Sequence, residues 1–206
     1  CEVRTAESTA ARHLTDIEAI ILDSRLPGTV KDLALTVFRK LAEAEAGVHG
    51  CQVGEVHFHE VGAVDAIVDI VGCALCLDYL GVTRVAVSAL PQGRGFVNCR
   101  HGRLPLPAPA TLALTKGLPV YGVDLEGELV TPTGAAIAAA VGKAFGPMPP
   151  MTVRSVGYGA GQRRYDEQPN LLRIAIGEPC AGDFAKDQGY LTDGVDILET
   201  TIDDMN

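Results

Sequence analysis

The spacing of apolar and polar residues predicts three helices in the first part of the chain. Residues 15–18 form a capping-box pattern typical of a helix start, and a Leu-Pro-Gly break at 26–28 ends that helix. Residues 30–46 repeat apolar positions at the spacing of one helix face, and a glycine follows them. Residues 62–80 are apolar on most sides, which predicts a long buried helix.

Further along the chain, short β-branched runs alternate with helical segments. The expected elements are strands at 55–59, 84–89 and 118–123, helices at 108–116 and 134–145, hairpin strands at 151–158 and 170–176, and a strand beginning at 196. This order predicts a mixed α/β or α+β fold, in which helices pack on a mixed sheet and a β-hairpin follows residue 150.

Composition limits the classes of protein to which the chain can belong. With 206 residues, 47% hydrophobic and 21% charged, it is long and apolar enough to fold around a core. The formal charge of −9 argues against general nucleic-acid binding, which needs a basic face. No apolar run reaches the roughly 18 residues of a membrane helix, and no signal-peptide pattern is visible. Six scattered cysteines do not form a disulfide framework, so a reducing, cytoplasmic setting is expected.

Two histidines and two aspartates form the first candidate site. In an extended segment His57 and His59 point to one face, and two imidazoles at this spacing can chelate one divalent metal. A chance pair on a surface strand is the simpler explanation. On the helix that follows, Asp65 and Asp69 share a stripe with two cysteines. The stripe either lines a cleft that binds a metal or a cationic ring, or it faces solvent or pairs with arginines.

A second candidate site lies in an arginine-rich stretch. In extended chain Cys99 and His101 share a face and offer a sulfur and an imidazole nitrogen. Arg94, Arg100 and Arg103 are the densest positive charge in an acidic chain, and guanidinium groups suit phosphate or carboxylate. The alternative is a solvated loop whose arginines bridge to the acidic stripe.

A third candidate is the start of the helix predicted after residue 131. Thr131 or Thr133 would cap this helix, whose first turn exposes free N–H groups that can bind an anion. Helix capping alone explains the same two residues, so both interpretations stay open.

Several segments of the chain resemble one known family. The segments at 57–72, 101–110, 127–136, 157–161 and 199–205 resemble, in the same order, those of the nickel-pincer cofactor biosynthesis protein family LarC. The match spans nearly the whole chain, and the histidine–glutamate–aspartate segment is its most specific part.

The resemblance implies an activity that composition does not show. Members of the family insert nickel into pyridinium-3,5-bisthiocarboxylate mononucleotide and form the nickel–carbon bond of the pincer cofactor, a lyase-class reaction. It consumes CTP with manganese or magnesium, and the product serves lactate racemase-type apoenzymes. No nucleic acid or membrane is an expected partner, and the sequence leaves open whether the chain forms a homo-oligomer.

The resemblance and the residue chemistry together assign roles to the candidate residues. Nickel accepts imidazole, carboxylate and thiolate ligands. Either Glu60 or Asp65 is expected to accept the ring proton lost when carbon is metallated. The expected metal ligands are His57, His59, Asp69, Cys99 and His101, and the expected substrate anchors are Arg94, Arg100, Arg103, Thr131 and Thr133.

The resemblance also predicts a domain boundary. Residues 1–195 correspond to the amino-terminal metal and substrate domain without its glycine-rich opening, and residues 196–206 begin the CTP-handling domain. The isolated chain is therefore not expected to complete the reaction. A second hypothesis is a non-catalytic metal-binding or scaffold domain, with all chemistry in the remaining part of the protein.

Overall fold

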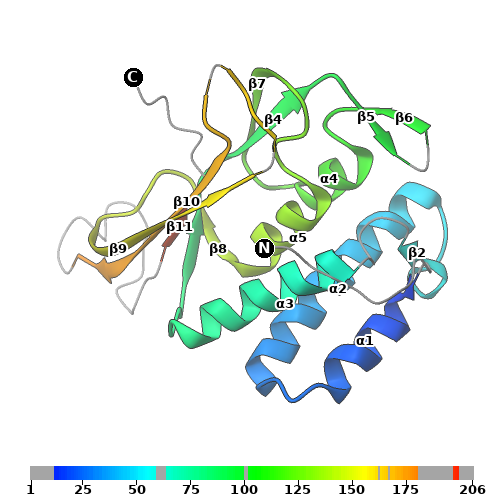
Figure 1. Ribbon diagram of the computed structural model, residues 1–206, viewed down its shortest axis with the longest axis horizontal. Coiled ribbons are helices and arrows are strands. Elements are labelled where there is room, and N and C mark those ends of the chain that lie inside the picture. The colour runs from blue at the N-terminus through cyan, green and yellow to red at the C-terminus, as the bar shows by residue number, and fades with distance from the viewer. Residues whose placement is uncertain are drawn as a thin grey trace.

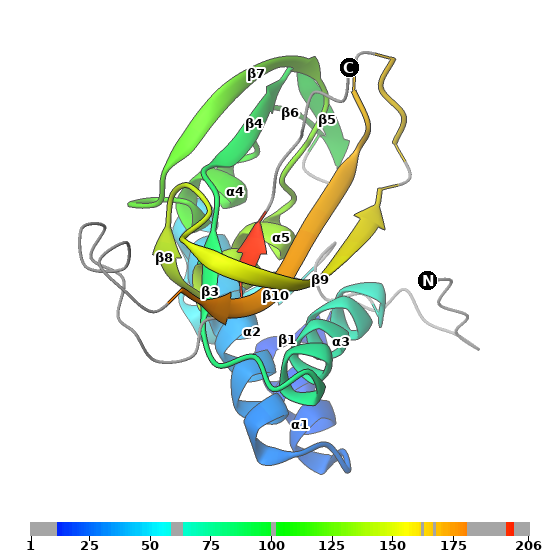
Figure 2. The same cartoon turned by 90° about the vertical axis from the view of Figure 1, so that its left-hand side faces the viewer.

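Most of the strands lie on one side of the molecule, and the first helices of the chain lie on the other, in the computed structural model (Figure 1). The structure describes residues 12–58, 64–99, 102–161, 163–166 and 168–180, and the backbone of 197–199. The helices are α1 (Leu14–Asp23), α2 (Gly28–His49), α3 (Val64–Tyr79), α4 (Pro109–Leu114) and α5 (Pro132–Val141). Helices α1, α2 and α3 form one layer, and Figure 2 shows most of the strands above them, with α4 and α5 between. The predicted mixed fold is confirmed.

The first helix begins two residues earlier than the capping pattern suggests. Its N-cap is His13, and the backbone N–H of His13 donates to the Asp16 carboxylate at 2.9 Å. The helix starts there because the two preceding residues, Arg12–His13, form strand β1. Glu18 ties α1 to α2 through an ion pair with Arg39, at 3.0 Å.

The second helix is the centre of the helical layer. It packs against α1, α3, α4 and α5, and its buried face includes Phe38 and Leu41, both fully buried. It ends at Gly50, which has a φ of 65°. This left-handed conformation strains residues with a side chain, so glycine suits the C-cap.

The third helix lies at the surface, so the prediction that it is buried on most sides is wrong. Its buried residues are Ala66, Ile70 and Ala74, at the i, i+4 spacing of one face. That face packs on α2, while Val68 and Leu75 on the other sides are exposed. A run of apolar residues therefore overstates burial here, because only one side of the helix finds a partner.

The strands are distributed over small sheets rather than one large one. The antiparallel pairs are β1 (Arg12–His13) with β2 (His57–Phe58) and β5 (Phe96–Cys99) with β6 (Gly102–Pro105). The parallel pairs are β3 (Val85–Val87) with β8 (Gly142–Phe145) and β4 (Leu90–Arg94) with β7 (Val120–Glu126). A short 3-10 helix, Val53–Glu55, precedes β2.

A three-stranded sheet contains the predicted hairpin. Strands β9 (Met151–Ala160) and β10 (Leu171–Pro179) are antiparallel, which confirms the prediction. Strand β11 (Ile197–Glu199) pairs with the other edge of β10. The end of α5 also differs from expectation, because this helix ends at Val141 and the last four residues of the predicted helix form β8. Gly142 favours this break, since glycine is a poor helix former and β3 offers a strand partner.

The apolar core has two main parts among the described residues. The larger lies among the helices and contains Ile17, Phe38 and Ile70, together with Phe58 of β2. The smaller joins β3 and β4 to α5. None of the described helices is long and apolar enough to cross a membrane.

Candidate functional site

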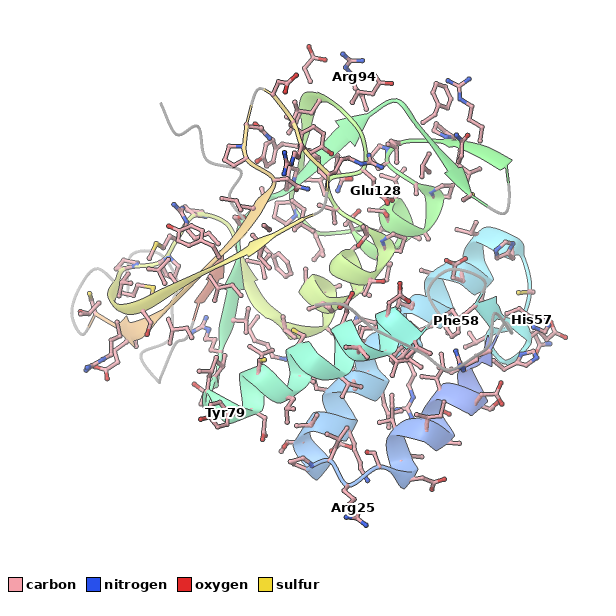
Figure 3. All side chains as sticks on the ribbon, viewed as in Figure 1. Arg25, His57, Phe58, Tyr79, Arg94 and Glu128 are labelled. Carbon is pink, nitrogen blue, oxygen red and sulfur yellow. The ribbon has the colours of Figure 1, made fainter. Side chains whose placement is uncertain are left out.

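The predicted metal ligand His57 lies on a short strand whose other face is buried in the core. Val56 and Phe58 are each 2% exposed, whereas His57 is exposed, so the alternation predicted for this segment is confirmed. The Phe58 ring packs edge-on against Phe38 of α2, with ring centroids 6.4 Å apart. Figure 3 shows Phe58 directed toward the helices and His57 directed away from them. The packing of Phe58 in the core therefore fixes the position of the neighbouring His57 side chain.

A second imidazole, which sequence reasoning missed, lies directly beside His57. The register of β1 and β2 pairs His13 with His57, and their ring centroids are 3.9 Å apart with planes tilted by 51°. The Nδ1 atom of His13 is buried and makes no hydrogen bond. No local spacing marks this pair, because its members come from strands separated by two helices.

Four of the predicted site residues lie outside the part of the chain that the structure describes. They are His59, Glu60, Arg100 and His101. Their assigned roles stay predictions. Within the described ranges, no group of three or more histidine, cysteine, aspartate or glutamate side chains lies close enough to hold a metal ion.

The two aspartates of α3 are exposed. Asp65 lies in the first turn, where one of its carboxylate oxygens accepts the backbone N–H of Ala66 at 2.8 Å. Asp69 follows one turn later and is also exposed. Both carboxylates therefore lie in solvent and need no buried partner, so the solvent-facing alternative describes this half of the stripe. Their roles toward a metal or a proton stay predictions.

The arginine-rich stretch forms the end of β4 and the β5–β6 hairpin. Arg94 is exposed and forms an ion pair with Asp124 of β7, and the hydrogen bond with that carboxylate raises the pKa of Arg94. The Arg103 guanidinium lies 4.0 Å from the centre of the Phe96 ring, a cation–π contact that orients it. Figure 3 places Arg94 at the upper edge of the molecule, far from His57. The structure therefore does not bring Arg94 together with the histidine pair.

Cys99 and the two threonines have local structural partners. The Cys99 thiol donates to the Gly102 carbonyl at 3.4 Å, which closes the hairpin. The Thr131 hydroxyl accepts the backbone N–H of Gly134 at 3.2 Å and caps α5, so the capping interpretation is confirmed for Thr131. Thr133 lies half-buried within the first turn. Ligand binding by any of these groups stays a prediction.

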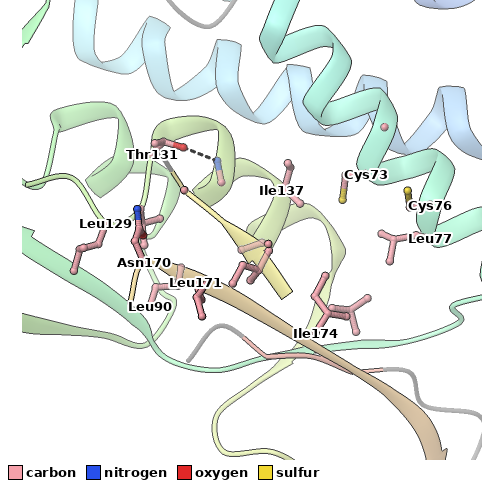
Figure 4. A pocket seen from close by; sticks show the side chains of 18 of the residues that line it. Cys73, Cys76, Leu77, Leu90, Leu129, Thr131, Ile137, Asn170, Leu171 and Ile174 are labelled. Atoms are coloured by element: carbon pink, nitrogen blue, oxygen red, sulfur yellow. Dashed lines mark hydrogen bonds between the residues drawn. The ribbon is translucent and has the colours of Figure 1, made fainter. Parts of the chain in front are cut away.

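The second half of the α3 stripe borders a cavity of about 540 Å³ (Figure 4). It lies between α3, α5, β4 and the β9–β10 hairpin, and its lining is mostly leucine, isoleucine and valine. The polar side chains at its wall are Cys73, Cys76, Thr131 and Asn170. The Asn170 amide is already engaged, because it donates to the Arg163 carbonyl at 3.2 Å.

The electrostatics of this cavity are unfavourable for an anion. Burial, and secondarily the neighbouring Cys76, raises the pKa of the Cys73 thiol to about 11. Cys73 is therefore a neutral thiol near pH 7. Among the described residues that line the cavity, none is lysine or arginine. A phosphate or thiocarboxylate would lose its hydration there without gaining a cation.

Comparison with known proteins identifies the family. The model of the family described as "Nickel insertion protein" matches residues 1–206, the whole chain. The chain belongs to the nickel insertion protein family. Nickel is the metal that this family handles, so the imidazole of His57 on β2 and the carboxylates of Asp65 and Asp69 on α3 are of a kind that suits it.

Relatives of this nickel insertion family member support the assignment over its full length. The chain is 56% identical to a protein of Geotalea daltonii over 100% of its own length, and 54% identical to one of Geotalea uraniireducens over 99%. A protein of Geobacter metallireducens is 52% identical over 99% of the chain. The name of each contains the words "nickel insertion protein". The chain spans about half the length of these relatives, and no solved structure matched it.

Proposed function

We propose that the whole protein inserts nickel into pyridinium-3,5-bisthiocarboxylate mononucleotide and thereby makes the pincer cofactor of lactate racemase-type enzymes. In this lyase-class reaction CTP is consumed with manganese or magnesium, through a part of the protein beyond residue 195. The observation that carries the proposal is the match of the nickel insertion family model to all 206 residues. The segments quoted from the sequence, above all 57–72, support the finer substrate assignment.

In this proposal the metal is held where β2 leads into α3. His57 supplies one imidazole from a strand anchored in the core, and His59 and Asp69 are the further donors. Nickel accepts nitrogen and oxygen ligands of these kinds. When the ring carbon binds nickel, the C–H electron pair becomes the nickel–carbon bond and the proton passes to a carboxylate, Glu60 or Asp65.

The anionic groups of the substrate require a cationic surface elsewhere. The exposed guanidinium of Arg103 is held over the Phe96 ring on the β5–β6 hairpin. A guanidinium held in one orientation loses little freedom when it binds phosphate. The apolar cavity is not proposed as the phosphate site, because its described walls carry no cation.

The proposal also places the protein in the cytoplasm. Cys51, Cys73, Cys76, Cys99 and Cys180 are all free thiols. Free thiols persist in a reducing compartment, whereas secreted proteins of this size commonly pair theirs.

The nickel-binding part of the proposal is tested by equilibrium dialysis of the full chain against Ni²⁺. His57→Ala should weaken nickel binding at least about tenfold, since it removes a ligand and even the outer-shell partners of a metal contribute roughly 10–100-fold. The matched control is His49→Ala, because His49 lies at the end of α2 beside Glu45, at 3.4 Å. Unchanged nickel affinity in the His57 variant would refute the metal site.

A second candidate function is a metal-holding domain without catalysis. The exposure of Asp65 and Asp69 favours it, because a catalytic base commonly acts in a site that excludes water, whereas these two carboxylates face solvent. The two candidate functions are distinguished by the variants Asp65→Asn and Asp69→Asn in the full-length protein. Loss of racemase activation with nickel binding retained supports catalysis, and full activation by both variants supports the metal-holding function.

A further inference from the structure

We propose that His13 is a second nickel ligand, which forms a two-imidazole site with His57 across the β1–β2 ladder. The inference rests on the proposed function and adds to it a residue that no motif marks. His13 precedes α1, far from the segment at 57–72 that indicates metal binding. Tertiary structure alone brings the two rings together.

The geometry of the ladder directs both imidazoles to one face. Residues directly opposite in an antiparallel pair carry their side chains on the same side of the sheet. The register pairs His13 with His57 and Arg12 with Phe58, so the Arg12 position belongs to the other face, on which Phe58 is buried. Arg12, the charged residue next to His13 in the sequence, therefore does not belong to the face that would bind the cation.

The separation of the rings is close to that of a chelate. Two imidazoles bound at about 2.1 Å to one ion, roughly at right angles, have ring centres about 4.5 Å apart. The observed centroid distance is 3.9 Å with a 51° tilt, roughly 0.6 Å shorter than that spacing, and the His57 ring is exposed. The Nδ1 atom of His13 is buried and has no hydrogen-bond partner in the structure.

Both histidines are positioned by elements that are anchored in the core. Phe58 follows His57 and packs against Phe38. His13 is the N-cap of α1, its backbone is held by Asp16, and the fully buried Ile17 follows within the first turn. An ion would therefore meet two ligands that are already side by side, and little conformational entropy would be lost on binding. Carboxylates or water would complete the coordination.

The test compares nickel binding of the full chain with that of His13→Asn, His57→Ala and the double variant. Asparagine is among the preferred N-cap residues, so His13→Asn removes the imidazole while retaining the start of α1. We expect each single variant to weaken nickel binding at least about tenfold. The loss of nickel affinity in the double variant should be much smaller than the product of the two single losses, since removing either imidazole already breaks the chelate. Urea denaturation and His49→Ala serve as controls.

The outcomes separate this inference from the proposed function. If His57→Ala weakens nickel binding and His13→Asn does not, His13 is not a ligand while the proposed function stands. If neither does, both proposals fail. A measurement on the unmodified chain avoids any folding effect: substoichiometric Ni²⁺ should broaden the ring proton resonances of His13 and His57 before those of His49. A sharp His13 resonance alongside a broadened His57 resonance would overturn the inference.

Discussion

The thiol of Cys73 offers a direct test of the electrostatics of the cavity. Burial, with a smaller contribution from Cys76, raises its pKa from 9.0 to about 11. A raised pKa means that less thiolate is present at any given pH. At about pH 8 a thiol of pKa 9.0 is roughly 10% ionised, whereas Cys73 would be roughly 0.1% ionised.

The thiolate is the nucleophile, so this difference can be measured as a rate. We expect iodoacetamide to alkylate Cys73 about 100-fold more slowly at about pH 8 than an unperturbed thiol. The cavity wall also shields the sulfur, but shielding lowers the rate by the same factor at every pH. The midpoint of the rate against pH therefore reports the pKa and should lie near 11. Peptide-resolved mass spectrometry after timed alkylation supplies the rates.

A matched variant separates the two causes of the shift. In Cys76→Ala the neighbouring thiol is gone but the burial remains, so the midpoint should stay well above 9.0. Circular dichroism at each pH checks that the chain stays folded. A Cys73 midpoint near 9.0 in the unmodified chain would show that water reaches the sulfur. The conclusion that the cavity is neutral and unsuited to anions would then be wrong.

Two stability predictions test the packing that positions the site. Phe38→Ala removes a fully buried ring that contacts Phe58, and it should lower the free energy of unfolding by about 3–5 kcal/mol in urea denaturation. Thr131→Ala removes the cap of α5 and should cost about 1 kcal/mol, whereas Thr133→Ala, inside the first turn, should cost less. A loss below about 1 kcal/mol for Phe38→Ala, or equal losses for the two threonine variants, would contradict these assignments.

Local patterns in the sequence predicted the elements well. Period-two alternation placed Phe58 inside and His57 outside, and the capping signature at Thr131 marked the start of α5. The alternating segments after residue 150 form the expected hairpin. These features depend on neighbours within a few positions of the chain, and steric and hydrogen-bonding preferences at that range act without tertiary context.

Burial of the third helix could not be predicted from its composition. The sequence of α3 is apolar on most sides, yet only the face containing Ala66 and Ile70 meets a partner. The hydrophobicity of a side chain determines how much free energy its burial would contribute. Whether the side chain is buried depends on whether another element packs against that side of the helix. The same reason explains β8, because residues 142–145 become a strand once β3 lies beside them.

The sequence by itself determined the mixed fold, the family and the chemistry available to the site, since these follow from residue types and short-range order. Tertiary structure decided which groups meet. It placed His13 against His57, paired Arg94 with Asp124 and set Cys73 at an apolar cavity. Such contacts join residues that are distant along the chain, and the free energy that selects them is that of packing the whole core.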